Sequence, residues 1–255
     1  MRIMTFNIKF ENDDDKENSW QNRRDLVTRL VQRYSPAIAG TQEGKWNQLL
    51  YLKNSMPDYA MYAPRRVIDD ISQYPTLFYQ EKSYTVEGGG EFWLSKTPDV
   101  HLSKDWDSAF PRMMSYGIFL DEKNKRRFLA VVTHLDHKGS KARWHQAKII
   151  NRFIQNHTGP VILMGDFNDT PGSSVHQILC SSASGLRDTW ELLERREGEQ
   201  SMTHHGFLGL PLKTRMDWIL VSNHFRVIDA QIIRDNREGS YPSDHYPYAV
   251  DLEWI

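Results

Sequence analysis

Several short apolar runs of this sequence begin or end at side chains that bind cations or move protons. Asn7 follows one such run, Glu43 follows another, and His134 ends a third. The complete set in chain order is Asn7, Glu43, His134, Asp136, Asp166, Asn168, Asp217, Asp244 and His245. Binding and catalytic side chains usually lie on loops at the edge of a rigid scaffold. These positions are therefore candidates for one site.

The donor groups of this set are carboxylates, amides and imidazoles, without a thiolate. Oxygen ligands of this kind suit a hard cation such as Mg²⁺, with Mn²⁺ as an alternative. Zinc fits less well as the cofactor, because the chain has one cysteine and lacks a His-Glu-x-x-His helix. A hard cation beside histidines suits phosphate ester hydrolysis, because the cation neutralises phosphate oxygens while a base prepares water.

Two short motifs are more specific than the single residues. In Gly165-Asp166-Phe167-Asn168, two polar residues flank an apolar one and could face the same side. In Ser243-Asp244-His245, a carboxylate that can bind metal stands next to an imidazole that can act as a base. A lone aspartate at a strand end more often forms part of a turn, and a lone histidine is more often a hydrogen-bonded residue without a catalytic role. The ordered set is more specific than any member.

The elements that must position these residues can be predicted from hydrophobic spacing. Apolar residues at helical spacing, followed by proline or glycine, predict helices over residues 20–34, 45–56 and 140–157. Short β-rich runs predict strands over residues 3–8, 37–41, 76–79, 115–120, 128–133, 161–164, 218–221, 227–234 and 248–252. This order indicates an α+β or layered α/β protein with packed sheets and helices outside, and it is too irregular for an eightfold βα barrel.

The composition narrows the class of protein. The 255 residues include 32 Lys+Arg and 33 Asp+Glu, a net charge of −1, with 12% aromatic residues. These values are typical of a soluble globular protein and exclude a disordered chain. We expect no membrane span and no signal peptide, and the lone Cys180 fits a reducing, cytoplasmic location. The near-zero charge argues against a protein that holds nucleic acid through a bulk positive field.

The ordered motifs resemble those of the endonuclease/exonuclease/phosphatase superfamily, which includes deoxyribonuclease I, exonuclease III, sphingomyelinases and inositol-polyphosphate 5-phosphatases. The resemblance covers nearly the whole chain, from Thr5-Phe6-Asn7 onward. It rests on Thr41-Gln42-Glu43, Thr133-His134-Leu135-Asp136-His137, Gly165-Asp166-Phe167-Asn168, Arg215-Met216-Asp217-Trp218 and Ser243-Asp244-His245. Phe92-Trp93-Leu94-Ser95 with Thr97-Pro98 is similar to a bacterial branch of metal-dependent hydrolases.

The resemblance implies a four-layer α/β sandwich of two packed mixed β-sheets flanked by helices, in a single domain spanning residues 1–255. It implies that Glu43 is the main Mg²⁺ ligand with Asn7 close by. Asp244 would either join the metal site or hold His245.

The resemblance also implies the catalytic roles. His245, paired with Asp217, would be the general base that activates water, and the pairing would stabilise the imidazolium formed on proton uptake. Asp166 and Asn168 would orient the phosphate and the nucleophile. In part of the family the residue at the place of Asp166 is instead proposed as the base or as the group that protonates the leaving oxygen. His134 would contact the scissile phosphate.

One position departs from the deoxyribonuclease-like pattern. There, a glutamate ahead of the strand end that corresponds to Phe78-Tyr79 supports the phosphate-contacting histidine. Here that place holds Gln73 or a neighbour, and Asp69 or Asp70 could substitute. The protonation state of His134 is therefore left open.

Further residues have both a functional and a structural interpretation. Asp136 is expected on the same face as His134, and His137 on the other. Arg65 and Arg143 belong to basic clusters near the predicted site and are candidate substrate contacts. The segment 204–207 could be a substrate loop, although an exposed turn is favoured. Residues 88–90 are expected to be a tight strand connection, and residues 123–127 a solvated hairpin tip.

Three functions remain open at this point. The first, which the prevalence of nucleases in the superfamily and the local basic clusters favour, is a Mg²⁺-dependent phosphodiesterase or nuclease with nucleic acid as its partner. The second is a phosphatase or phosphodiesterase for a small or lipid-derived phosphate ester, with Trp93 and Trp106 as candidate pocket walls. The third is a binding protein whose catalytic site is no longer active. The presence of all the candidate metal-binding and base residues argues against it. We expect a monomer in each case.

Overall fold

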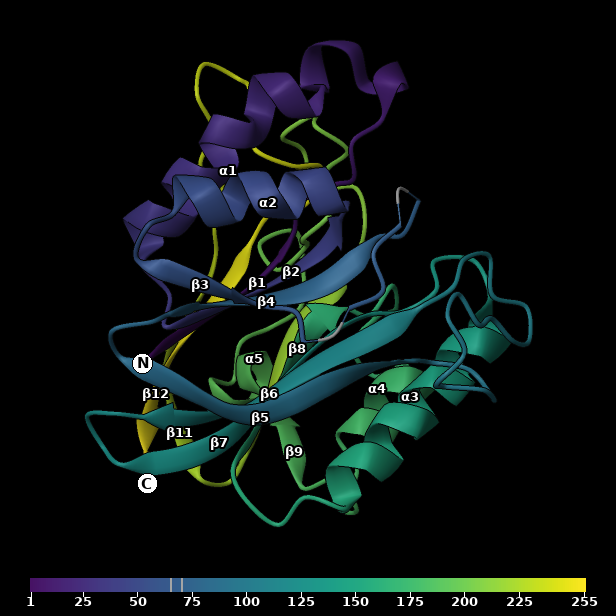
Figure 1. Cartoon of the computed structure of the whole chain (residues 1–255), viewed down its shortest axis with the longest axis vertical. Helices are drawn as coiled ribbons and strands as arrows, with labels where there is room; N and C mark the ends of the chain where they lie inside the picture. Colours follow the sequence, from purple (N-terminus) through teal and green to yellow (C-terminus); the bar gives the residue numbers. More distant parts are fainter. Residues whose placement is uncertain (65, 70) are drawn as a thin grey trace.

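Two six-stranded sheets pack face to face in the computed structural model, which describes residues 1–64, 66–69 and 71–255 (Figure 1). The first sheet has the order β11 (Phe225–Ile232), β12 (Tyr248–Trp254), β1 (Arg2–Asn7), β2 (Ile38–Gly44), β4 (Tyr74–Gln80) and β3 (Tyr59–Tyr62). The second has the order β5 (Tyr84–Trp93), β6 (Met113–Asp121), β7 (Arg126–His134), β8 (Val161–Asp166), β10 (Asp217–Ser222) and β9 (Leu186–Asp188).

Helices cover the outer faces of the two sheets. The α1 (Trp20–Tyr34) and α2 (Trp46–Ser55) helices lie over the first sheet, and α3 (Ser140–Gln155) and α4 (Ser174–Leu179) lie beside the second (Figure 1). The short η1 (Asp13–Asn18) and α5 (Thr189–Leu192) complete the helical elements. The predicted four-layer α/β sandwich is therefore confirmed.

Three buried apolar clusters hold these layers together. One lies between the sheets, one under α1 and α2, and one under α3 and α4. Fully buried members of these clusters include Ile38 and Ile162, Phe6 and Leu49, and Leu163 and Ile150, respectively. Because both sheets are buried on both faces along their central strands, those strands read as nearly continuous apolar runs.

The pairing of the central strands brings their functional ends together. The β1 strand runs parallel to β2 with α1 as the crossover, and β7 runs parallel to β8 with α3 as the crossover. In the register, Asn7 lies opposite Gln42, and Asp166 lies opposite both His134 and Asp217. The polar residues predicted at strand ends thus collect at one edge of the two sheets.

The structure confirms the predicted helices and strands with small differences in their bounds. The long strand β5, the short strands β3 and β9 and the short helices were not predicted. The expectation for residues 88–90 is wrong, because these glycines lie inside β5 and pair with β6. Gly89 has a φ of 151°, and a Cβ atom there would lie 2.2 Å from the Tyr116 carbonyl oxygen. Among the described residues, no helix could span a membrane.

Candidate active site

The side chain of Asn7 joins the two sheets at this edge. Asn7 ends β1 and is fully buried. Its Nδ2 donates to Glu43 Oε1 on β2 at 3.1 Å and to Asp166 Oδ2 on β8 at 2.9 Å. One amide therefore fixes the separation between a carboxylate of the first sheet and a carboxylate of the second.

Glu43 is presented by an irregular stretch of β2. The register of β2 against β4 shifts between Thr41 and Gly44, and Glu43 adopts a φ of 65°. A non-glycine residue in this left-handed region stores strain, which clusters at functional sites. Glu43 Oε2 also accepts a hydrogen bond from the Phe10 backbone N–H at 3.1 Å. The strained backbone and two donors together aim the carboxylate toward Asn7.

Asp244 lies next to this pair through the loop before β12. Ser243 Oγ donates to the backbone oxygen of Asn7 at 2.7 Å, and Lys9 Nζ lies 3.6 Å from Asp244 Oδ2. Burial alone would raise the pKa of Asp244, but the neighbouring positive charges of His245 and Lys9 lower it. Asp244 is thus an anionic ligand candidate. The binding of Mg²⁺ by the oxygen atoms of Asn7, Glu43 and Asp244 stays a prediction.

His245 and Asp217 form the predicted imidazole–carboxylate pair. His245 Nδ1 lies 2.8 Å from Asp217 Oδ2, and both residues are buried. The other ring nitrogen, Nε2, lies 3.8 Å from Asp166 Oδ2. Burial would lower the pKa of His245, but the carboxylates of Asp217 and Asp166 outweigh it and raise the pKa to about 10. The pair fixes the ring so that Nε2 faces the interior of the site.

Asp166 lies between the two histidines of the site. It lies 3.4 Å from His134 Nε2 and accepts the Asn168 backbone N–H at 2.9 Å. Burial raises the pKa of Asp166, and the nearby charge of Asp217 raises it further, to about 7. Asp166 can therefore hold or release a proton near neutral pH, which fits a group that exchanges protons with water or with a leaving oxygen.

His134 has an arginine where a carboxylate was expected. Arg112 Nη1 lies 2.9 Å from His134 Nδ1, and its Nη2 lies 3.3 Å from His137 Nδ1. The candidate carboxylate Asp69 does not take this place. Asp69 pairs with His101 at 2.9 Å, and Asp70 lies outside the described residues. Burial and the charge of Arg112 hold the pKa of His134 well below its usual value.

This contact determines which nitrogen of His134 carries the proton. A guanidinium group can only donate hydrogen bonds, so His134 Nδ1 must accept from Arg112. The neutral ring then carries its proton on Nε2, which lies 3.4 Å from Asp166 Oδ2, whereas the Asn168 Nδ2 at 2.9 Å is a donor and cannot accept that proton. His134 is therefore set up as a neutral donor rather than as an imidazolium.

The predicted substrate contacts have protein partners in this structure. Asp136 is fully buried and accepts backbone N–H groups of Ala109, Phe110 and Gly139, so it anchors the loop that leads to Arg112. Arg143 pairs with Asp169 at 3.1 Å and donates to the Asp136 backbone oxygen. Arg65 lies outside the described residues. Substrate contact by these three residues stays a prediction.

Sequence reasoning missed Arg112 and Lys9 and undervalued the segment 204–207. The pattern Pro111-Arg112-Met113 before a strand gives no local signal for a histidine partner more than twenty residues away. The exposed turn favoured for 204–207 is wrong for His205, which is fully buried and stacks on Tyr246.

Comparisons with known proteins identify the family of this chain. The model of the Endonuclease/Exonuclease/phosphatase family matches residues 4–245. A structure of a mannosyl-6-phosphatase from Bacteroides thetaiotaomicron is 29% identical, covers 100% of both chains and has a TM-score of 0.89. An endonuclease/exonuclease/phosphatase from Bacteroides vulgatus is 30% identical, with a TM-score of 0.90 over 100% of this chain and 98% of that one.

A more distant structure shares the fold alone. The TDP2 protein of D. rerio, complexed with a single-strand DNA product, is 15% identical, with a TM-score of 0.79 over 99% of this chain and 98% of that one. A search of curated sequences found no match. The match over nearly the whole chain shows that this protein belongs to the endonuclease/exonuclease/phosphatase family of phosphoester hydrolases.

Proposed function

We propose that this protein is a Mg²⁺-dependent phosphatase for small phosphate esters. The observation that carries the proposal is the Asn7 amide, which bonds both Glu43 and Asp166 beside the Asp217–His245 pair. A metal-binding carboxylate and the proton-transfer groups are thereby held at one point. This is the arrangement that metal-assisted attack of water on a phosphoester requires.

Glu43, Asn7 and Asp244 are the residues that would hold the cation, with Mn²⁺ as an alternative. When bound there, the cation neutralises charge on the phosphate oxygens. The other residues act on protons. A cation held beside it by Asp244 would lower the raised pKa of His245, so that Nε2 can take a proton from the attacking water, and Asp217 stabilises the resulting imidazolium through Nδ1. His134 donates its Nε2–H to a phosphate oxygen, and Asp166 supplies a proton to the leaving oxygen.

The charge around the site favours a small substrate over nucleic acid. Nonspecific duplex binding relies on many lysine and arginine contacts to phosphates. Here two of the described arginines near the site are already paired, Arg66 with Glu91 at 2.8 Å and Arg143 with Asp169 at 3.1 Å. The net charge is −1. The similarity over both full chains to a mannosyl-6-phosphatase also supports a sugar phosphate or a related monoester.

An apolar cavity next to Arg112 offers space for part of such a substrate. It has a volume of about 190 Å³, and its lining includes Trp93, Leu102, Phe110 and Arg112. Trp93 therefore keeps the role of a pocket wall predicted from sequence. Trp106 does not line this cavity and stacks instead on His145.

A substrate panel tests this proposal. Hexose phosphates, other small monoesters, small diesters, duplex and single-stranded DNA, and RNA are compared at low and physiological salt with Mg²⁺. We expect phosphate release from small monoesters and no comparable cleavage of the nucleic acids. Preferential turnover of DNA or RNA would overturn the substrate class and return the function to the nuclease first indicated by the sequence.

A further inference from the structure

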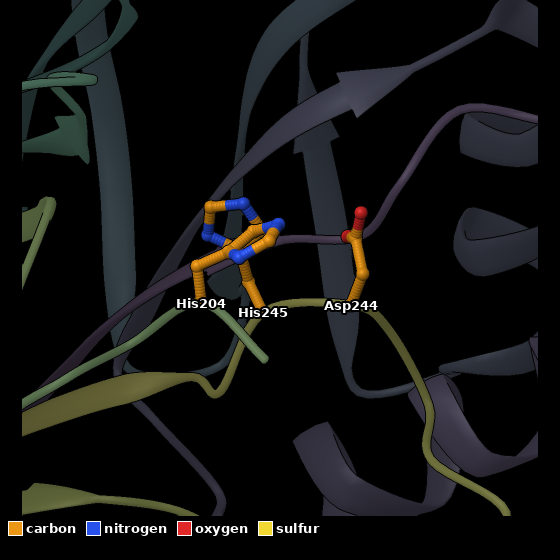
Figure 2. A group of neighbouring side chains, drawn as sticks. All are labelled: His204, Asp244 and His245. Carbon is orange, nitrogen blue, oxygen red and sulfur yellow. The ribbon is translucent and has the colours of Figure 1, made fainter. Parts of the chain in front are cut away.

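His204, Asp244 and His245 form a cluster whose members come from two loops (Figure 2). One ligand atom from each residue lies within 4.8 Å of the others. Backbone contacts connect the two loops. The His205 backbone N–H donates to the Asp244 backbone oxygen at 2.9 Å, and His204 forms an antiparallel bridge with His245. His204 is therefore held beside the catalytic pair by backbone contacts as well as by its ring.

The His204 ring has a nitrogen atom that makes no hydrogen bond within the described part of the chain. Its Nδ1 is buried and has no hydrogen-bond partner among the described residues. The ring lies edge-on to His245, with centroids 5.0 Å apart and an interplanar angle of 84°. An unpartnered buried nitrogen is costly unless something binds there.

We propose that His204, His245 and Asp244 bind a transition-metal cation of the zinc type. Two imidazoles and one carboxylate are ligands that suit zinc, whereas Mg²⁺ prefers oxygen ligands. Three protein ligands with an open fourth position form a common zinc arrangement. Asp217 already holds His245 Nδ1 at 2.8 Å, which is the carboxylate–histidine support that zinc-binding histidines usually have.

Such a cation competes with the proposed hydrolysis, and this consequence rests on the proposed function. His245 cannot accept a proton from water while its ring nitrogen binds a metal, and Asp244 is shared with the predicted Mg²⁺ ligands. Zinc at this site is therefore an inhibitor and not the cofactor. The nearby Lys9 ammonium, 3.6 Å from Asp244 Oδ2, opposes the cation, whereas the carboxylates of Asp166 and Asp217 favour it.

Direct metal binding to the full chain tests the site without any substrate. Zn²⁺ binding is measured by calorimetry, and Co²⁺ is used as a probe whose visible spectrum reports tetrahedral nitrogen and oxygen ligation. His204→Phe keeps an aromatic ring against His245 but removes the nitrogen ligand. His157→Asn is the control, because it removes an imidazole at the end of α3, outside the cluster.

We expect the wild type and His157→Asn to bind one Zn²⁺, and His204→Phe to bind it roughly 10-fold or more weakly. Thermal unfolding without metal checks that the variant folds. Equal Zn²⁺ affinity in His204→Phe and the wild type would overturn the site. Binding that is lost in Glu43→Gln but unchanged in His204→Phe would do the same, because it would place zinc at the predicted Mg²⁺ ligands.

The inhibition is tested separately with Mg²⁺ and a hydrolysed monoester. We expect His204→Phe to keep Mg²⁺-dependent activity and to need roughly 10-fold more Zn²⁺ for half inhibition. Inhibition that does not depend on His204 would contradict the proposed consequence. If no substrate is turned over, the proposed function fails, but the binding experiment still decides the metal site.

Discussion

Replacement of Arg112 by methionine tests how His134 is prepared for contact with phosphate. Arg112 is buried, with Nη1 2.9 Å from His134 Nδ1 and Nη2 3.3 Å from His137 Nδ1. Methionine keeps an unbranched stem in the same space but removes the donors and the charge. The change therefore isolates what the guanidinium group contributes.

The expected loss of stability is modest. The variant leaves His134 Nδ1 buried without a donor, which costs about 1–3 kcal/mol. Arg112 Nε also lies 3.8 Å from Asp136 Oδ2, but Asp136 keeps its bonds from the backbone N–H groups of Phe110 and Gly139. The cost should therefore stay below the ~3–5 kcal/mol of a broken buried ion pair. Urea unfolding of both proteins measures this difference.

The expected loss of activity is larger. Without Arg112 the imidazole can rotate or adopt the other tautomer, and loss of a partner that orients a functional histidine typically costs about 10- to 100-fold. The pH profile should also change, because the charge of Arg112 helps to lower the pKa of His134. Removing that charge raises the pKa, so His134 becomes positively charged at a higher pH than in the wild type.

Two measurements check this prediction. The first is kcat/KM between about pH 5 and pH 8, the range in which histidines usually titrate. As the pH is lowered through this range, the activity of Arg112→Met should begin to fall at a higher pH than the activity of the wild type. The second is the ¹⁵N NMR signal of the His134 ring, which should show Nε2–H in the wild type. Arg112→Gln keeps one donor without the charge and serves as the matched variant. An unchanged pH profile and unchanged ring signals in Arg112→Met would refute the assigned role.

Two further changes test other parts of the structure. Asp217→Asn removes the charge that stabilises the His245 imidazolium, so kcat should fall by about 10²- to 10⁴-fold, whereas Asp229→Asn on the exposed strand β11 should leave steady-state rates unchanged. Gly89→Ala places a Cβ atom 2.2 Å from a carbonyl oxygen at a φ of 151°. Urea unfolding should therefore show that the free energy of unfolding falls by about 1–3 kcal/mol. Gly88→Ala is the control and should change it little, because no atom lies within 4 Å of its Cβ.

The fold was largely predictable because its central strands and main helices have strong local patterns. The helix over Trp20–Tyr34 has regular apolar spacing and a proline just beyond its end. The strand β5 escaped prediction because glycines 88–90 weaken any strand signal. There, close approach to β6 favours glycine, so the tertiary contact and not the local propensity decides the structure.

The site was predictable to the extent that its residues end apolar strands. The contact of Asn7 with Glu43 follows from the pairing of β1 with β2, whereas the contacts of Asn7 with Asp166 and of Asp217 with His245 cross between the two packed sheets. The partner of His134 was not predictable. The identity of this partner depends on how the loop before β6 folds over β7. Arg112 occupies the place where a carboxylate was expected.

The most direct test of this account measures phosphate release from a small monoester against Mg²⁺ concentration. The wild type, Glu43→Gln and His245→Gln are compared, with His157→Gln, just beyond the end of α3, as a control and circular dichroism as a check of folding. We expect wild-type activity to require Mg²⁺, to vanish with excess chelator, and to fall by roughly 10²-fold or more in Glu43→Gln and His245→Gln. Full activity in chelator, or in either of these two folded variants, would contradict it.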